Sequence, residues 1–177
     1  GLDFIFIKYG YLGIDYFARK ESWAGKTYDL KQFNVYGEIQ LTKWLQLGGG
    51  VNYGEKINYD AQPSYKGKGY EGQFIMVLQP NDKLNLSFNF YHSDLLKDQE
   101  KIYDVNIYYL HTTYQFNRYL FLRAVAQYDS YEKRMLTDFL ASFTLIPGTV
   151  LHLGYGGIYE SREWQDNRWL YGQGDLL

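Results

Sequence analysis

The segment His92-Ser93-Asp94 contains the three residue types of a nucleophilic catalytic triad. In such a triad the histidine takes the proton of the serine hydroxyl and the carboxylate orients the histidine, so the side chains must contact one another. Adjacent residues of a β-strand point to opposite faces, which separates His92 from Ser93 if the segment is extended. We therefore interpret the segment as polar residues at a strand–loop boundary and predict that the chain is not an enzyme. A membrane-embedded hydrolase with a site at the rim, built on His92 and Ser93, is the alternative.

The sequence gives little support for a metal site, a cofactor site or a nucleic-acid-binding site. The two remaining histidines, His111 and His152, lie in separate segments and no metal-ligand spacing recurs, so we predict no metal and no cofactor. The chain has no cysteine, which excludes thiolate ligands and a cysteine nucleophile. The Gly48-Gly49-Gly50 run precedes a strand pattern and not a helix, so it lacks the geometry of a phosphate loop. The net charge is −2 without a basic block, and we predict no nucleic-acid partner.

The elements that carry these residues are predicted from alternation with a period of two. From Phe33 to Leu41 the odd positions are apolar or glycine and the even positions are polar or tyrosine, which is the pattern of a two-sided β-strand. Similar runs recur along the chain, and we call their apolar positions the apolar rows. The rows are Leu12/Ile14/Tyr16/Ala18, Phe33/Val35/Gly37/Ile39/Leu41, Leu45/Leu47/Gly49/Val51/Tyr53, Tyr70/Gly72/Phe74/Met76/Leu78, Leu84/Leu86/Phe88/Phe90, Leu120/Leu122/Ala124/Ala126/Tyr128, Phe139/Ala141/Phe143/Leu145 and Leu151/Leu153/Tyr155.

Two segments alternate less cleanly. Extending the first strand backwards places Lys8 in its apolar row, so we expect a bulge or break near Gly10. In residues 103–116 the apolar row is predicted to begin Val105, Ile107, Tyr109, opposite Asp104 and Asn106. Because His111 then falls in the same row, we expect a register change in this strand.

The connections alternate between short and long. Short turns are predicted at 42–44, 80–83, 117–119 and 147–148, and long polar loops at 20–28, 55–68, 93–101, 129–135 and 160–175. Short turns on the periplasmic side and longer loops outside are typical of transmembrane β-barrels. Leu176-Leu177 reads as the start of a further strand, and Phe4–Ile7 as the tail of an earlier one.

The apolar rows are better explained as surfaces that face membrane lipid than as the core of a soluble protein. They contain no Asp, Glu, Lys or Arg, and each alternating run covers roughly 9–11 residues, the length that a tilted strand needs to cross a bilayer. Tyrosines close several rows at the long-loop end and aromatic residues lie beside short turns, as expected for two interfacial belts. We predict an all-β fold: an antiparallel transmembrane β-barrel in the bacterial outer membrane, with membrane lipid as its partner. A soluble barrel that binds an apolar ligand is the alternative.

The whole chain, residues 1–177, is predicted to form one barrel domain or a fragment of one, with a meander of about nine strands. Single-chain bacterial barrels have even strand numbers, so we expect further strands or domains from a parent protein. Five charged residues of the polar rows are predicted to face the lumen, either as a selective constriction or as a salt-bridged interior without a selective role. They are Glu38, Glu71, Asp104, Arg123 and Asp138.

The stretch from Gln115 to Tyr128, with Arg134–Phe143 and Pro147–Tyr155, resembles the C-terminal barrel region of an uncharacterised family of Gram-negative outer-membrane proteins. Members of that family often carry an N-terminal domain similar to family-nine carbohydrate-binding modules. The resemblance implies a barrel with a link to carbohydrate binding or uptake, although the matching residues are strand and turn residues and the carbohydrate-binding domain is absent here. From the residues themselves we predict a porin-like channel or a membrane anchor segment.

Overall fold

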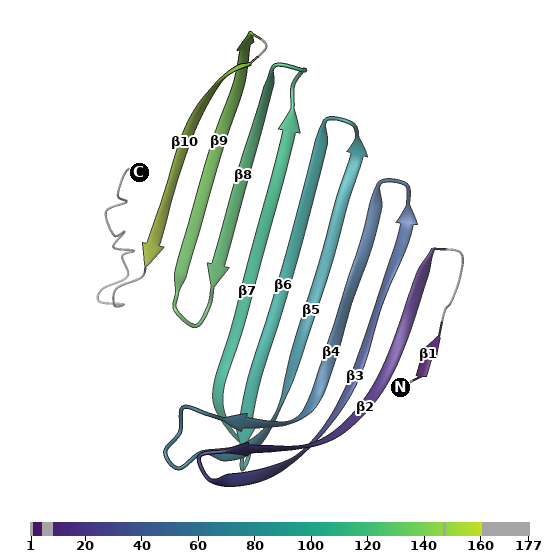
Figure 1. The fold of residues 1–177 in the computed structure, drawn as a ribbon, viewed down its shortest axis with the longest axis vertical. Helices are drawn as coiled ribbons and strands as arrows, with labels where there is room; N and C mark the ends of the chain where they lie inside the picture. Colours follow the sequence, from purple (N-terminus) through teal and green to yellow (C-terminus); the bar gives the residue numbers. More distant parts are fainter. Residues whose placement is uncertain (1, 5–8, 147, 161–177) are drawn as a thin grey trace. The chain divides into compact units, whose positions relative to one another are not determined.

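The computed structural model describes residues 2–4, 9–146 and 148–160. These residues form ten β-strands that pair in sequence order as one antiparallel meander (Figure 1). The strands are β1 (Leu2–Phe4), β2 (Gly10–Trp23), β3 (Lys26–Thr42), β4 (Leu45–Asn58), β5 (Tyr65–Asn81), β6 (Leu84–Lys97), β7 (Glu100–Gln115), β8 (Leu120–Asp129), β9 (Arg134–Ile146) and β10 (Thr149–Glu160). The predicted all-β antiparallel meander is confirmed, and β2–β10 are its nine long strands. Among the described residues, none form a helix long and apolar enough to span a membrane.

The chain divides into two compact units. Unit 1 comprises residues 1–41, 47–74 and 91–105, and unit 2 comprises residues 42–46, 75–90 and 106–177. This division concerns packing within the sheet, and the prediction of a single domain over 1–177 stays a prediction.

The register within unit 1 confirms the first two apolar rows. Ile14 pairs with Val35 and Tyr16 pairs with Phe33 across β2 and β3, so both rows lie on one face. We call the face that carries the apolar rows the apolar face and the opposite one the polar face. β2 begins at Gly10, as the predicted break requires, while Lys8 lies outside the described residues. The predicted earlier strand is described only in part, because β1 ends at Phe4 and residues 5–7 are not described.

The register within unit 2 confirms the rows of β8, β9 and β10 but corrects that of β7. Leu122 pairs with Ala141, and Tyr155 pairs with Phe139. On β7, however, Tyr108 pairs with Tyr128 and Leu110 with Ala126, so the even positions lie on the apolar face. The predicted row Val105, Ile107, Tyr109 was therefore wrong for this strand, whose even phase runs unchanged from Tyr108 to Tyr114 without the expected register change. The partner strand decides the phase, because Leu110 and Tyr114 continue the row of β8 while His111 is kept off it.

Within the described residues the predicted long loops are largely strand, whereas the loop predicted at 160–175 lies outside them beyond Glu160. β2 and β3 continue to a two-residue turn at Ala24-Gly25, and β6 and β7 to one at Asp98-Gln99. All four turn residues have positive φ (50°, 76°, 51° and 71°), as a type I′ hairpin turn requires. Between strands of the described part of the chain, residues 59–64 and 130–133 are the longer connections that remain. The polar segments were interpreted as loops because their apolar alternation ends, yet the backbone ladder continues beyond the apolar rows.

Few hydrophobic side chains are buried. Among the described residues they are Leu30, Ile57 and Leu95, all in unit 1 near the hairpin ends of their strands. In Figure 1 the ends of β2–β5 that carry these hairpins bend away from the direction of the rest of the strands. Close backbone approach accompanies the bend: a Cβ on Gly54 would lie 2.7 Å from the Cα of Gln32, so this position of β4 requires glycine.

Candidate functional site

A largely enclosed polar cluster of unit 1 is centred on Lys56. Its Nζ donates to Ser93 Oγ at 2.9 Å and to the carbonyl oxygen of Asp94 at 3.0 Å, and it pairs with Glu71 Oε1 at 3.0 Å. The Lys56 side chain is only 12% exposed, and its Nζ lies 5.5 Å from the centre of the Tyr103 ring. Buried ammonium groups need such partners because desolvation of an unpaired charge is costly.

Local strand geometry explains how the cluster forms. Lys56 is three residues beyond Tyr53 on β4, so alternation places it on the polar face. Glu71 follows Tyr70 on β5 and therefore points to the same face, from the neighbouring strand. Ser93 comes from β6 and is buried, with 8% of the residue exposed. Sequence reasoning assigned Glu71 to this face but missed Lys56, because residues 55–68 were predicted to be a loop.

This arrangement does not activate Ser93 as a nucleophile. An activated serine hydroxyl donates its proton to a base. Here the ammonium group of Lys56 uses its three N–H bonds on Ser93, Asp94 and Glu71, so it acts as a donor and not as a base.

His92 belongs to a different group. Its Nε2 lies 3.7 Å from Asp94 Oδ2, and its Nδ1 lies 3.6 Å from Asp104 Oδ1. Asp94 Oδ1 in turn accepts the backbone N–H of Tyr70 at 2.6 Å. His92 and Ser93 thus have separate partners, as alternation along the strand predicted. Within residues 2–4, 9–146 and 148–160, no group of three histidines or carboxylates could hold a metal ion.

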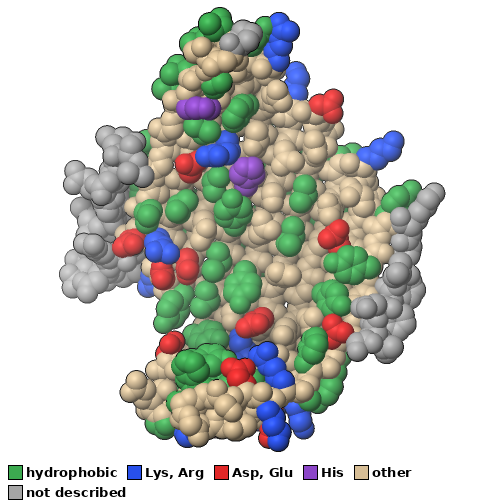
Figure 2. Space-filling view, in the orientation of Figure 1, with side chains coloured by type: hydrophobic (Ala, Val, Ile, Leu, Met, Phe, Trp, Pro, Cys, Tyr) green, Lys and Arg blue, Asp and Glu red, His purple; other side chains and the backbone are tan. Residues whose placement is uncertain are grey.

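In unit 2 the polar face carries an ion pair between neighbouring strands. Arg123 Nη2 lies 2.9 Å from Asp138 Oδ1. Arg123 pairs with Leu140, and Val125 pairs with Asp138, so all four residues lie opposite the apolar row of β8 and β9. Arg123 Nε is buried without a hydrogen-bond partner in the described part of the chain. Because Val125 and Leu140 lie beside this ion pair, the polar face of unit 2 carries both charged and hydrophobic side chains. Figure 2 shows charged side chains close to hydrophobic ones on the face in view.

The five predicted lumen residues do not form one site. Arg123 and Asp138 contact each other, and Glu71 contacts Lys56. Glu38 pairs in register with Tyr11, opposite the apolar rows of β2 and β3. That these four residues face a lumen stays a prediction.

Asp104 departs from the predicted face. Counting back in steps of two from Tyr108 places it on the apolar face, where it contacts His92 and lies 2.6 Å from Lys101 Nζ. The hydrogen bond that Lys101 donates to Asp104 raises the pKa of Lys101. The wrong phase predicted for β7 put Asp104 on the polar face, and the pairing with β8 corrects it.

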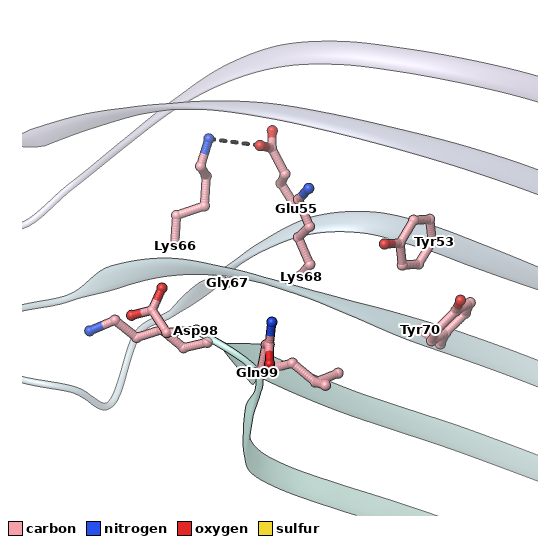
Figure 3. Close-up of a pocket in the computed structure, with 10 residues that line it drawn as sticks. Tyr53, Glu55, Lys66, Gly67, Lys68, Tyr70, Asp98 and Gln99 are labelled. Carbon is pink, nitrogen blue, oxygen red and sulfur yellow. Dashed lines mark hydrogen bonds and ion pairs between the residues drawn. The ribbon is translucent and has the colours of Figure 1, made fainter.

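A second cluster lies where the apolar rows of β4 and β5 end. The rings of Tyr53 and Tyr70 are 4.5 Å apart between centroids, and beyond them Lys66 Nζ pairs with Glu55 Oε1 at 2.9 Å. The hydrogen bond from Lys66 lowers the pKa of Glu55, although partial burial opposes the shift. Figure 3 shows Tyr53 and Tyr70 at one side of a pocket and the Lys66–Glu55 pair at another.

The pocket has a volume of about 460 Å³ and combines aromatic, aliphatic and charged groups. It is lined by Tyr53, Glu55, Lys66, Gly67, Lys68, Tyr70, Leu96, Lys97, Asp98 and Gln99, all from unit 1.

Comparisons with known proteins find similarity among solved structures. No protein-family model matches the chain, and a search of curated proteins finds no match. Over 83% of its length the chain is similar to the toluene transporter TodX of P. putida, with 14% identity and a TM-score of 0.38, and it covers 47% of that protein. Over 85% of its length it is similar to the CymD monoaromatic hydrocarbon channel, with 14% identity, a TM-score of 0.40 and 51% coverage of that protein. The chain thus spans about half the length of the two structures, and neither match supports the predicted carbohydrate link.

Proposed function

We propose that the chain forms part of the wall of a β-barrel in the bacterial outer membrane, and that this barrel is a channel. The observation that carries the proposal is that the apolar rows of paired strands share one face in both units and contain no charged residue. Val51 is 50% exposed in unit 1, and Phe139 and Leu153 are 49% and 65% exposed in unit 2. A soluble barrel would bury such rows as its core.

The distribution of charge supports a lipid-facing role for these rows. The ion pairs Lys56–Glu71 and Arg123–Asp138 both lie on the polar face. A lysine or arginine on the lipid face at the midplane of the bilayer costs roughly 2–4 kcal/mol, which explains why the rows lack them. The strands of 10–17 residues are long enough to cross the hydrocarbon core.

The polar face favours a channel over a passive anchor. Arg123 and Asp138 lie among Val125 and Leu140, so a solute that passes this wall meets both charged and apolar groups. This face would line the lumen, where rings of charged side chains control which ions pass. The resemblance to the family with carbohydrate-binding modules remains a hypothesis, and no contact described above bears on a sugar.

Conductance in planar bilayers tests the channel. We expect the complete protein to give discrete conductance steps, and Arg123→Gln to shift the anion-to-cation permeability ratio toward cations, because it removes a positive charge from the lumen wall. Arg118→Gln, at a short turn, is the matched control and should leave the ratio unchanged. Membrane insertion without conductance would show an anchor. A protein that stays monomeric in water without detergent would overturn the membrane assignment altogether.

A further inference from the structure

His111 lies on the polar face of unit 2, beside the ion pair between Arg123 and Asp138. It pairs in register with Val125 on β8, and Val125 pairs with Asp138 on β9, so these three residues lie at one level of the face. Arg123 is two residues from Val125 and is therefore a diagonal neighbour of His111, at about 7–8 Å. A charge on this imidazole acts on the same region as the pair, because the Debye length is about 10 Å at 0.1 M salt.

His152 lies on the same face, at the other side of the ion pair. It pairs with Ser142 on β9, which is two residues from Leu140, and Leu140 pairs with Arg123 on β8. The residue of β10 that pairs with Leu140 is Gly154, where an added Cβ would meet no atom closer than 3.8 Å. β10 therefore places no side chain between the imidazole and the ion pair. Figure 2 shows histidine side chains near charged ones on the face in view.

The two histidines have few charged or titratable neighbours. Next to His111, β7 carries Tyr109 and β8 carries Arg123. The polar positions of β6, the other neighbour of β7, are uncharged: Asn85, Ser87 and Asn89. Next to His152, the charged residue of β9 that lies nearest along the polar face is Asp138. Within the described part of the chain neither histidine forms an ion pair, so no carboxylate there compensates a proton that an imidazole gains.

Other charged residues of this face are farther away. On β8, β9 and β10 they are Asp129, Arg134 and Glu160, which lie at the ends of the strands away from the short turns. Each is four residues along its strand from the level of His111, which corresponds to about 13 Å. Salt therefore screens their effect on this stretch of the wall.

The charge of the wall between these levels depends on the two histidines. Arg123 and Asp138 are held together at 2.9 Å and neutralise each other. Histidine is the side chain whose charge ordinarily changes between about pH 5 and pH 8. His111 is half-buried and His152 is exposed, so both imidazoles are open to protons from the lumen. As the pH falls through this range the wall changes from neutral to positive.

We propose that His111 and His152 determine the ion specificity of the channel and make it depend on pH. Protonated imidazoles attract small anions such as chloride to the wall and repel cations, as rings of basic side chains do in anion-selective pores. With both imidazoles neutral, the paired charges of Arg123 and Asp138 discriminate weakly. This role rests on the proposed function, because it requires that the polar face lines a water-filled lumen.

Reversal potentials of the complete protein in planar bilayers under a KCl gradient measure the anion-to-cation permeability ratio. Between pH 8 and pH 5 we expect this ratio to rise at least about twofold, the effect of one unit charge at about 8 Å in water. The double variant His111→Gln/His152→Gln should lose this rise. His111→Lys, which keeps a positive charge at pH 8, should raise the ratio already at that pH. His92→Gln is the matched control and should keep the rise, because His92 contacts Asp104 on the apolar face.

Two results would overturn the role of the histidines. They are a ratio that stays constant between pH 8 and pH 5 in the wild type, and an equal rise in the double variant and the wild type. Discrete conductance steps in the same recordings would leave the proposed channel intact, whereas the absence of conductance at every pH would refute the proposed function as well. If the double variant does not insert, His111→Lys decides, and an unchanged ratio at pH 8 overturns the role of His111.

Discussion

Asp94 holds two neighbouring strands together near the hairpin end of β6. Its side chain is only 11% exposed, and its carboxylate accepts the Tyr70 backbone N–H at 2.6 Å. Asp94→Ala leaves that N–H without an acceptor, and we expect a loss of about 1–3 kcal/mol in the free energy of unfolding. Asp94→Asn keeps an acceptor and should lose less.

Urea titration of the vesicle-inserted protein, followed by tryptophan fluorescence, measures these losses. Asp82→Ala, an exposed carboxylate at a short turn, is the control and should unfold like the wild type. Equal stability of Asp94→Ala and the wild type would contradict the role given to this carboxylate.

Glu55 gives a prediction about pH. Its pKa lies below the ordinary value of 4.5 in the folded protein, chiefly through the hydrogen bond from Lys66. The folded state therefore favours the carboxylate. The resulting stabilisation is fully present above the unfolded pKa and is lost as the pH falls through the lower folded value. The contribution is small, under about 1 kcal/mol, because the pair is partly open to solvent.

Glu55→Gln should therefore remove part of the acid sensitivity of stability below about pH 4.5 and flatten the curve there. Unfolding midpoints of both proteins measured from pH 3 to pH 7 check this. Parallel curves for the variant and the wild type over that range would exclude the Lys66–Glu55 pair as a stabilising contact.

At the scale of the strand, the alternation of apolar and polar residues decides how well the sequence predicts which face each residue lies on. The rows of β2, β3, β8, β9 and β10 were predicted correctly because one face of each strand is consistently apolar. The apolar row of β7 was predicted wrongly because both faces of this strand carry apolar residues. Only the pairing with β8 shows which positions lie on the apolar face. The Asp98-Gln99 turn was missed for another reason: neither residue is glycine, and nothing local marks the positive φ of both.

The polar cluster around Lys56 could likewise be predicted only in part from local alternation. Glu71 could be placed on a face from the sequence, but Ser93 and Lys56 both lie in segments that were predicted to be loops. The contacts of Lys56 are made to β5 and β6, which follow β4 in the sheet. Such contacts join residues up to 38 positions apart, and no local pattern encodes them.

Neighbouring positions of β9 offer a direct comparison of the two faces. Phe139 lies on the apolar face and Leu140 on the polar face, next to each other near the middle of the strand. Phe139→Arg should lower the stability of the inserted protein by about 2–4 kcal/mol because it places a charge in lipid. Leu140→Arg places the charge in a lumen and should cost much less.

Folding yields into vesicles and urea midpoints of the two variants measure the difference. The comparison is internal, because the same substitution is made one residue apart on the same strand. Similar losses for both variants would contradict the assignment of the faces.

At the scale of the whole molecule, the described strands form a meander in which β10 pairs with β9 and with no further described strand. An unpaired strand edge cannot face lipid, because its N–H and C=O groups would have no partners. We therefore expect additional strands to close the barrel in the membrane. The central claim, however, depends on the faces and not on the number of strands: the apolar rows face lipid and the opposite face lines a lumen.

Spin labelling along β8 tests this claim most directly. The chain has no cysteine, so single cysteines at positions 122, 124 and 126 on the apolar face and 125 and 127 on the polar face give unambiguous labels. In the vesicle-inserted protein we predict high collision rates with oxygen at 122, 124 and 126, and high collision rates with a water-soluble nickel complex at 125 and 127. The opposite alternation, or no alternation between the two sets, would contradict the account.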